Sequence, residues 1–383
     1  MRRKKICFVV ASAVTAEAFL SDHIAALSER YDVHLIANVD PAAVAGAALR
    51  HATLHRVRIE RRIAPGSDIL ALGQLTRVFL RERFAAVHSV SPKAGLLTAL
   101  ASFITRIPVR IHAFTGQVWA TRRGPGRLLL KALDRVIARL NTHVLVDSPS
   151  QRDFLRMQGV LPATGGEVLG KGSVCGVDPD RFRPDPESRR NIRREIDIPI
   201  DAVAFLFLGR LNRDKGVLDL AKAFAAVVAQ EPRPFLVLVG PDEERLAAAV
   251  ETECAQVMSR VRFVGFSHEP ERFMAAADVF CLPSYREGFG SVIIEAAACG
   301  IPAVGSRIYG ITDAIEENVT GLLHEPGNVS ELAECMLRLA GDFELRRRLG
   351  DQARVRALRD FPADLITAEM LRFYDRALAQ ARR

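Results

Sequence analysis

The sequence is poor in aromatic residues and lacks a long hydrophobic run. Aromatic residues make up 7% of the 383 positions, and only one of them is a tryptophan. Proteins that read single-stranded nucleic acid stack bases on aromatic rings, so this scarcity, together with the lack of an RNA- or DNA-reading motif, argues against nucleic-acid binding. The apolar stretch 94–104 is shorter than the ~20 residues that span a bilayer, so any membrane contact has to be peripheral.

Cysteine patterns typical of metal or redox sites are also missing. The six cysteines include no C-x-x-C and no metal-like pairing with histidine. Several lie in apolar segments, which favours buried free thiols in a reducing cytosol. They are Cys7, Cys175, Cys254, Cys281, Cys299 and Cys335. The sequence has no low-complexity tract or short repeat, and its 49% of hydrophobic residues indicate a globular chain long enough for two domains.

The first residues imitate a secretory signal, because four basic residues, 2–5, precede the apolar segment 6–13. The alternative is the first buried strand of a sheet. A polar loop, a helix through 24–27 and a second apolar segment, 33–37, follow in the order of a β-α-β unit. We therefore predict a strand.

The net charge of +8 is unevenly distributed along the chain. Up to Lys171 about 25 lysines and arginines stand against about 12 acidic residues, and after it about 28 stand against about 33. A basic first half suggests an anionic partner there, such as lipid phosphate, diphosphate or nucleic acid.

Short apolar segments alternate with amphipathic helices in both halves, which predicts two α/β domains with doubly wound parallel sheets. A connection rich in glycine, proline and aspartate, 170–186, separates the halves, and we expect a cleft between the domains. Residues that directly follow strands matter most, because ligands of such sheets bind beyond the carboxyl ends of the strands. The expected strands are 6–10, 33–36, 86–88, 109–112 and 144–147 in the first half, and 204–208, 235–239, 261–264, 279–282 and 302–304 in the second.

Two carboxylates eight residues apart frame a predicted helix start. Glu287 lies in a loop after the strand-like segment 278–282, and Glu295 lies more than one turn into a helix expected over 291–299. Residues 288–290 fall at the N-terminal end of that helix, where free backbone N–H groups attract anions. Glu287 could accept hydrogen bonds from sugar hydroxyls and Glu295 from a ribose diol. The spacing alone is also compatible with a loop glutamate and an ordinary helix glutamate.

A second polar loop, 209–216, follows the apolar segment 204–208 and precedes a helix. Arg210 can bond two oxygens of a diphosphate with its planar guanidinium, and Lys215 adds a compact charge. Such a clamp would neutralise a leaving diphosphate. A solvated basic turn is the alternative for the segment alone, but both loops follow strands in the same half of the chain.

These motifs together resemble the retaining glycosyltransferases of family four. The resemblance extends through nearly the whole C-terminal half and includes 319–323 and 176–182. It implies a GT-B fold with two Rossmann-like domains that face a cleft. The first, 1–175, would bind the acceptor, and the second, 176–361, would bind the nucleotide sugar. A last helix, within 362–383, would cross back onto the first domain.

The resemblance also implies roles for individual residues. Arg210 and Lys215 would hold the donor diphosphate. Glu287 would hold the hexose hydroxyls and Glu295 the ribose, and Phe266 would border the nucleobase. His112, at the end of the strand 109–112, would lie near the donor sugar, although a lone histidine at a strand end is more often structural. The donor-binding set is Gly209, Phe266, Gly288, Phe289, Gly290, Ser291 and Glu295, and the catalytic set is His112, Arg210, Lys215 and Glu287.

The acceptor side departs from the family pattern. The first loop, 11–15, lacks the paired glycines that the family often has, and 309–313 replaces its frequent Gly-Gly-Ile-Pro-Glu-like segment. The segments 110–121 and 307–313 resemble the branch that acts in capsular, O-antigen or related surface-glycan assembly, whose acceptors are typically sugars on polyprenyl diphosphate. Candidate acceptor residues in the first domain are Ser12, Thr15 and Thr115.

A basic amphipathic helix is expected over 126–140. Cations recur every four residues among leucine, valine and isoleucine, and they are either an ordinary solvated face or a surface for anionic lipid headgroups. They are Arg127, Lys131, Arg135 and Arg139.

We therefore predict a retaining transferase that moves a hexose or N-acetylhexosamine from a UDP-linked donor to a lipid-carrier-linked glycan at the cytoplasmic membrane face. Front-side attack through an oxocarbenium-like state would need no metal and no cofactor, because fixed cations stabilise the leaving diphosphate. The lone D-x-D, 178–180, lies in the interdomain loop, which argues against a metal site. The alternatives are a GT-B sugar-nucleotide 2-epimerase and a non-catalytic glycan- or lipid-binding module.

Overall fold

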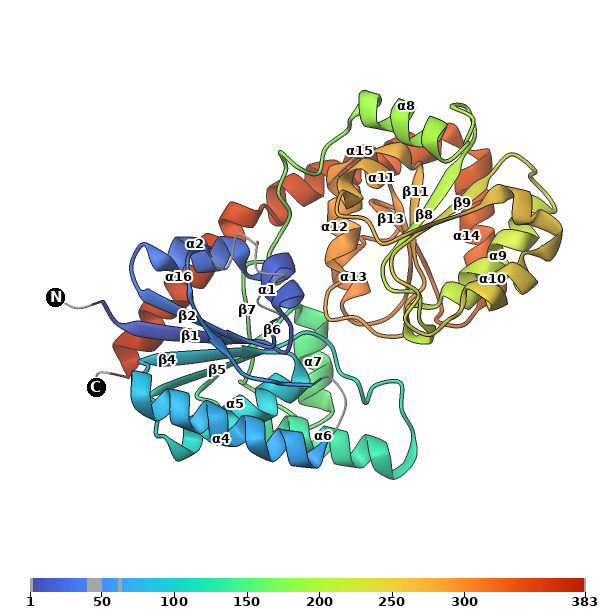
Figure 1. Cartoon of the computed structure of the whole chain (residues 1–383). Coiled ribbons are helices and arrows are strands. Elements are labelled where there is room, and N and C mark those ends of the chain that lie inside the picture. The colour runs from blue at the N-terminus through green and yellow to red at the C-terminus, as the bar shows by residue number, and fades with distance from the viewer. Residues whose placement is uncertain (1–2, 40–49, 61–63, 382–383) are drawn as a thin grey trace. The chain divides into compact units, whose positions relative to one another are not determined.

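The computed structural model describes residues 3–39, 50–60 and 64–381, and the chain divides into two compact units (Figure 1). Met1–Cys175 and Ala363–Arg383 form the first unit, and Gly176–Pro362 forms the second. Each unit is a parallel sheet with helices on both faces, as the alternation of apolar segments and amphipathic helices predicts.

The first unit contains a seven-stranded parallel sheet with the order β3-β2-β1-β4-β5-β6-β7. The apolar segment near the N-terminus forms β1, which lies between β2 and β4 and is almost completely buried, so its prediction as a strand is confirmed. The strands are β1 (Lys5–Val9), β2 (Asp32–Ala37), β3 (Thr53–Arg56), β4 (Ala86–Val90), β5 (Val109–Phe114), β6 (His143–Val146) and β7 (Glu167–Val168).

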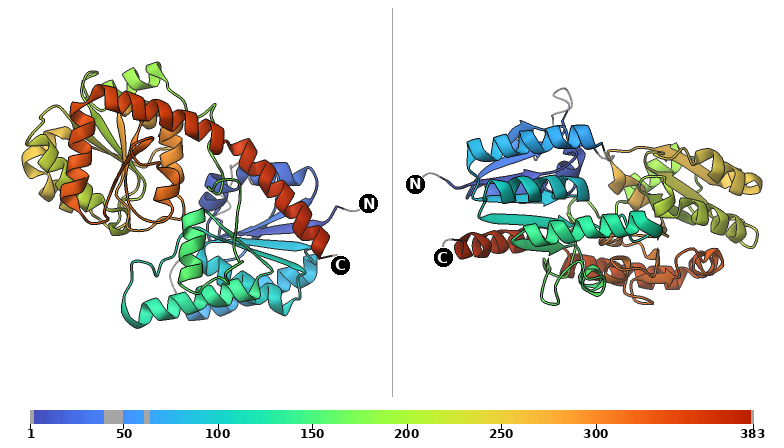
Figure 2. Two further views of the ribbon diagram at one scale, coloured as in Figure 1. Left: turned by 180° about the vertical axis from the view of Figure 1, so that it is seen from behind. Right: turned by 90° about the horizontal axis from the view of Figure 1, so that it is seen from below.

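The helices of the first unit cover both faces of its sheet. In Figure 1, α2 and α16 lie on one face, and α4, α5 and α6 lie on the other. Figure 2 shows α16, at the red end of the chain, along the first unit, where its apolar side chains complete the core around β1 and β2. The helices are α1 (Ala13–Phe19), α2 (Ser21–Ser28), α4 (Pro65–Glu82), α5 (Pro92–Ile104), α6 (Gly124–Leu140), α7 (Pro149–Met157) and α16 (Ala363–Gln380).

The second unit contains a six-stranded parallel sheet with the order β10-β9-β8-β11-β12-β13. The strands are β8 (Ala204–Leu208), β9 (Phe235–Val239), β10 (Val261–Gly265), β11 (Val279–Leu282), β12 (Ala303–Ser306) and β13 (Gly321–His324). The helices are α8 (Pro186–Glu195), α9 (Val217–Val228), α10 (Ala247–Glu253), α11 (Pro270–Ala276), α12 (Ser291–Ala298), α13 (Ile311–Ala314), α14 (Val329–Gly341) and α15 (Phe343–Asp360), with the short 3₁₀ helices η2 (Arg213–Lys215) and η3 (Ala255–Arg260).

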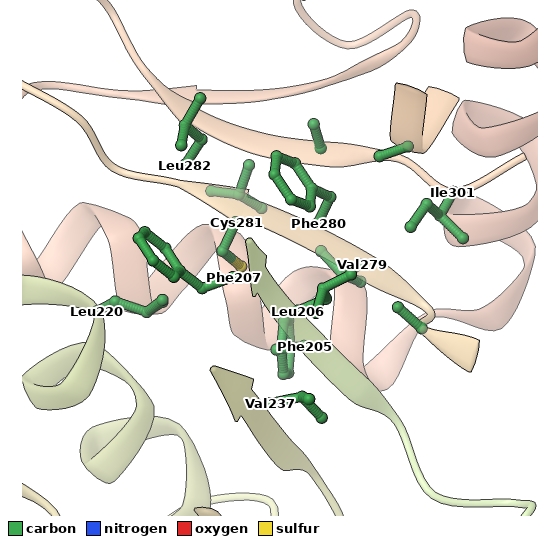
Figure 3. Close-up of a cluster of buried hydrophobic side chains, with 14 of the residues drawn as sticks. Phe205, Leu206, Phe207, Leu220, Val237, Val279, Phe280, Cys281, Leu282 and Ile301 are labelled. Carbon is green, nitrogen blue, oxygen red and sulfur yellow. The ribbon is translucent and has the colours of Figure 1, made fainter. Parts of the chain in front are cut away.

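Helices cover both faces of the second sheet, and its strands accordingly have apolar side chains on both faces. Consecutive residues of β8 and β11, such as Phe205 and Leu206, or Phe280 and Cys281, are all buried (Figure 3). Burial of both faces explains why these strands are continuous apolar runs rather than alternating patterns. All six cysteines are free thiols, and all but Cys175 are buried, in agreement with the sequence.

The ten predicted strands are present, and the sheets contain three further strands. β3 has a polar sequence at the sheet edge, and β7 is only two residues long. β13 overlaps the segment 319–323, which is part of the family resemblance and not among the predicted strands. One boundary matters for the site. β5 continues to Phe114, so His112 lies inside a strand and not at its end.

Both sheets reverse their strand order at an inner position, between β1 and β4 in the first unit and between β8 and β11 in the second. Crevices for ligands form at such switch points, beyond the carboxyl ends of the strands. No helix in the described ranges is long and apolar enough to cross a membrane.

Two histidines of the first sheet are completely buried. His88 on β4 lies 3.1 Å from the Tyr374 hydroxyl of α16, and His112 on β5 lies 2.9 Å from the Ser89 hydroxyl. Burial lowers the pKa of each imidazole from 6.5 to about 3. The unfolded chain therefore binds protons below about pH 6.5 that the folded unit does not bind, and stability falls as the pH falls through this range.

We expect the free energy of unfolding of the first unit to decrease by about 1.4 kcal/mol per pH unit for each of these histidines between about pH 6 and pH 4. Trp119, the only tryptophan, lies in this unit, so its fluorescence during urea unfolding reports the change. The His88→Gln variant can still bond Tyr374 and should lose about 1.4 kcal/mol per pH unit of this slope. An unchanged slope would mean that His88 is not held neutral.

Candidate active site

The candidate site lies at the switch point of the second sheet. β8 and β11 are parallel neighbours, with Phe205 opposite Val279 and Leu206 opposite Phe280. The loops that follow the two strands therefore emerge at the same edge, although they are far apart in the sequence. The first loop, 209–216, carries Arg210 and Lys215, and the second, 283–290, carries Glu287.

Lys215 and Glu287 form an ion pair between these loops. The Lys215 ammonium donates a short hydrogen bond to Glu287 Oε1, and the Ser284 hydroxyl donates to the same oxygen at 2.9 Å. Both charged side chains are mostly buried, with 20% of Lys215 and 12% of Glu287 exposed. The Asn212 side chain caps η2 by accepting the Lys215 backbone N–H at 3.1 Å, which fixes the start of the lysine side chain.

Contacts next to this pair fasten the same two loops. The Arg286 guanidinium bonds Asp214 Oδ2 at 2.8 and 2.9 Å, and the Tyr285 backbone N–H donates to the Asp214 carbonyl at 2.8 Å. The Tyr285 hydroxyl donates to Asp219 on α9 at 2.5 Å. Burial, with the hydrogen bond to Asp219, raises the pKa of Tyr285 to about 12, so the hydroxyl keeps its proton at neutral pH.

Glycine lets the two loops approach closely. Gly216 has φ +70, and a Cβ atom there would lie 2.0 Å from the Pro283 carbonyl oxygen. A similar contact joins Gly310, before α13, to the Gly288 carbonyl oxygen, which a Cβ would approach to 2.6 Å. The backbone around Lys215 and Glu287 is therefore fixed by contacts that no other residue type permits.

Arg210 is the most exposed of the proposed charged ligands. Its guanidinium bonds Glu243 at 2.8 Å, and 44% of its side chain is exposed. Gly209, just before it, accepts close contact with Gly240, where a Cβ would lie 1.9 Å from the Gly209 carbonyl oxygen. The backbone at Arg210 is thus held in place, while its exposed guanidinium group can change position.

The predicted helix start after Glu287 is present, but one of its side chains is not available to a donor. Gly290 adopts φ +80 and Ser291 begins α12, as expected for this turn. The Phe289 ring is buried, with its centroid 5.1 Å from that of Phe361. Phe289 is therefore a core residue whose backbone alone can face a donor, and the prediction from the sequence likewise assigns the backbone N–H groups of 288–290 to it. Gly288 lies at the contact with Gly310.

Glu295 lies on the second turn of α12, partly buried. Burial raises its pKa to about 7, Arg181 opposes this shift, and Glu271 adds to it. Arg181 bonds Glu271 at 2.9 Å, so a cation and two carboxylates share this part of the second unit. Phe266, directly after β10, is 62% exposed and stacks edge-to-face on His268.

The predicted residues of the first unit are more scattered. His112 has no exposed surface, because its ring packs against Gly95 of α5 and Phe114. The ring is thus enclosed between β5 and α5, and a role of His112 near the donor sugar stays a prediction. Ser12 precedes α1, Thr15 lies in its first turn, and Thr115 directly follows β5, and all three are partly buried at the carboxyl edge of the sheet.

The basic residues of α6 largely face the protein itself. Lys131 bonds the Gln158 side chain at 2.9 Å, with its ammonium 5.6 Å from the Trp119 ring centroid. Arg127 makes the same two contacts, and Arg135 bonds the Gly159 carbonyl at 2.8 Å. Only Arg139 of the four predicted cations is exposed. Three of the four cations therefore contact Trp119, Gln158 or Gly159 within the first unit, and a role of these cations at lipid headgroups stays a prediction.

The D-x-D segment forms a turn. The Asp178 carboxylate accepts the backbone N–H groups of Asp180 at 2.9 Å and Arg181 at 3.3 Å. Within the described ranges, no group of three or more histidine, cysteine, aspartate or glutamate residues could hold a metal ion.

Ser284, Asp214 and Arg286 bond within the two loops but are not among the predicted site residues. Ser284 lies three positions before Glu287. Asp214 directly precedes Lys215, and Arg286 directly precedes Glu287. Their only signal was membership of the same two loops.

Known proteins match both units. The family models described as Glycosyl transferases group 1 and Glycosyl transferase 4-like domain match residues 188–356 and 15–170. The capsular polysaccharide biosynthesis glycosyltransferase CapM of Staphylococcus aureus is 27% identical over 329 residues, which cover 85% of this chain and 86% of CapM. A UDP-Gal:alpha-D-GlcNAc-diphosphoundecaprenol alpha-1,3-galactosyltransferase of Escherichia coli is 24% identical over 74% of this chain and 73% of its own length.

The fold also matches a solved structure. Anabaena HepE in complex with UDP and glucose has a TM-score of 0.81 and 21% identity, over 97% of this chain and 99% of that one. The fold is thus GT-B. The chain belongs to the group 1 glycosyltransferases of family four and is a retaining glycosyltransferase.

The close approach of the two loops can be tested at Gly216. The Gly216→Ala variant should lose more than about 2 kcal/mol of stability in urea unfolding, because its Cβ meets the Pro283 carbonyl in addition to the positive φ. Gly265 is a matched control with φ +77 and nothing within 4 Å. Gly265→Ala should cost only about 1 kcal/mol. Equal losses would show that the contact with Pro283 adds nothing.

Proposed function

We propose that this enzyme transfers a hexose or N-acetylhexosamine from a UDP-sugar to a lipid-linked glycan in surface polysaccharide assembly. The observation that carries the proposal is the meeting of Lys215 and Glu287 at the switch point of the second sheet. A cation suited to a diphosphate and a carboxylate suited to sugar hydroxyls lie side by side there. The names of CapM and of the diphosphoundecaprenol galactosyltransferase support the pathway and the acceptor class.

The donor would extend over the carboxyl edge of the second sheet. Lys215 and Arg210 bind the diphosphate, and Arg210 exchanges Glu243 for it. Glu287 accepts hydrogen bonds from the hexose, and the backbone of 288–290 lies beside it. Glu295 accepts from the ribose, and the exposed Phe266 ring stacks on the base. A pKa of about 7 leaves Glu295 partly ionised at neutral pH.

The reaction would proceed by front-side departure and attack. The bond between the anomeric carbon and the diphosphate oxygen breaks, and the acceptor oxygen bonds the same face of that carbon. The acceptor proton passes to the leaving diphosphate. Lys215 and Arg210 stabilise the charge that develops on the diphosphate, and this fixed positive charge supplies what a metal supplies in other enzymes. Neither Glu287 nor His112 is assigned a covalent role.

Donor identity can be tested by thermal unfolding with UDP- and GDP-sugars. A matched donor at 100 times its dissociation constant adds ~2.7 kcal/mol of stability, so a clear shift with a UDP-sugar is expected. The Glu287→Ala variant should still bind UDP but lose at least about 100-fold in transfer, because the sugar is no longer oriented. Full turnover by this variant would contradict the role of Glu287.

Two alternatives predict different products. A sugar-nucleotide 2-epimerase converts the donor without an acceptor, so incubation with the donor alone separates it from a transferase. A non-catalytic binding module would neither transfer nor slowly hydrolyse the donor. The Lys215 and Glu287 pair favours a transferase over both.

The anionic membrane surface is the proposed partner of α6, with the enzyme peripherally bound at the cytoplasmic face. Leu128, Leu129 and Val136 of α6 are exposed, at 69%, 59% and 37%. Arg139 and the preceding pair Arg122 and Arg123 are exposed as well. Exposed apolar side chains with cations around them suit an interfacial helix, and a lipid-diphosphate acceptor would be reached there.

Vesicle pelleting tests this surface. Exposed cations near a lipid surface are worth about 1 kcal/mol each, so Arg122→Gln with Arg123→Gln should weaken binding to phosphatidylglycerol vesicles by about 30-fold. Arg190→Gln with Arg347→Gln removes the same charge from exposed positions of the second unit and serves as the control. Equal effects of the two pairs would contradict a specific surface on α6.

A further inference from the structure

The pair of Lys215 and Glu287 joins two side chains that would contact different parts of a donor. Among the described residues, Glu287 is the one side-chain partner of the Lys215 ammonium. Both side chains are mostly buried, so solvent screens their attraction less than at an exposed surface. The ammonium has further N–H donors for a phosphate, and a phosphate bound there would lie close to the negative charge of Glu287.

The neighbouring contacts keep Glu287 within reach of Lys215. Arg286 is bonded to Asp214, and the Tyr285 backbone is bonded to the Asp214 carbonyl. Ser284 holds the same carboxylate oxygen as Lys215 does, at 2.9 Å. The first two contacts fix the loop backbone at Glu287, and withdrawal of the carboxylate would break its bonds from Ser284 and Lys215, so its negative charge stays beside a bound diphosphate.

A substrate and a product would experience this charge differently. In a nucleotide sugar, the terminal phosphate is esterified, and the sugar beside it brings hydroxyls that can donate to Glu287. In the free nucleoside diphosphate, the terminal phosphate carries additional negative charge, because its second ionisation occurs near pH 6, and no hydroxyl lies next to it. A fixed carboxylate is thus satisfied by the substrate and repels the product.

We propose that Glu287 determines selectivity between donor and product: its charge, held beside Lys215, weakens binding of the free nucleoside diphosphate relative to the nucleotide sugar. The inference rests on the proposed function, because it takes Lys215 as the ligand of the diphosphate. It gives Glu287 a second task, which is to speed the release of a product that would otherwise occupy the same cations.

The test is the dissociation constant of UDP and of UDP-glucose, measured by titration calorimetry on the full chain. Glu287→Gln keeps the shape of the side chain and removes its charge. UDP should bind this variant about five- to tenfold more tightly than the wild type, as expected for removal of one poorly screened like charge. UDP-glucose should bind equally or more weakly, so the dissociation constant of UDP divided by that of UDP-glucose should fall by about fivefold or more. Glu287→Ala removes the same charge and should shift the ratio in the same sense.

Glu231→Gln is the matched control. Glu231 pairs with Arg233 at 2.8 Å just before β9, at the opposite edge of the same sheet, so its loss changes the net charge equally and should leave both constants unchanged. If Glu287→Gln and Glu287→Ala bind UDP no more tightly than the wild type, the inference is overturned while the proposed function stands. If the wild type does not bind UDP, the proposed function fails and the inference fails with it.

Discussion

The parallel pairing of β8 with β11 is the constraint on which the candidate site depends. These strands are neighbours in the sheet but not in the sequence, because the strand order reverses between them. The loops that follow the two strands begin at the same edge of the sheet. The chain after β8 leads towards β9, and the chain after β11 leads in the opposite direction, towards β12. The close contact of Gly216 with Pro283 brings them back together, and the charges of Lys215 and Glu287 meet as a consequence. In a sheet whose strand order did not reverse here, β8 and β11 would not be neighbours, and Lys215 and Glu287 would lie apart.

Much of this arrangement could be predicted from the sequence. Strands buried on both faces are continuous apolar segments, and this pattern located β8 and β11 and hence the loops after them. Glu287 and Lys215 belong to those loops, so their placement followed from strand ends. The direction of individual side chains did not follow. Phe289 lies between two glycines in a loop, and only the tertiary packing against Phe361 shows that its ring points into the core.

Charge periodicity was a weaker guide than apolar periodicity. The cations of α6 recur every four residues, which places them on one face of the helix but does not say what that face meets. Trp119 and the end of α7 meet it, and these contacts come from segments before and after the helix. The same limit applies to His112. A strand boundary two residues further on moves it from an edge into the interior, where Gly95 and Ser89 surround it. Local sequence sets such boundaries poorly, because pairing with the neighbouring strand decides where a strand ends.

The membership of α16 in the first unit has a consequence for how the chain is made. Ile366, Phe373 and Tyr374 of this helix are completely or almost completely buried in the core around β1 and β2. A ribosome releases residues 176–362 before this helix, so the second unit has all of its sequence while the first still lacks part of its core. The half of the protein that is synthesised first is therefore the half that is completed last, and its apolar β1 and β2 have to remain partly uncovered until the final helix arrives.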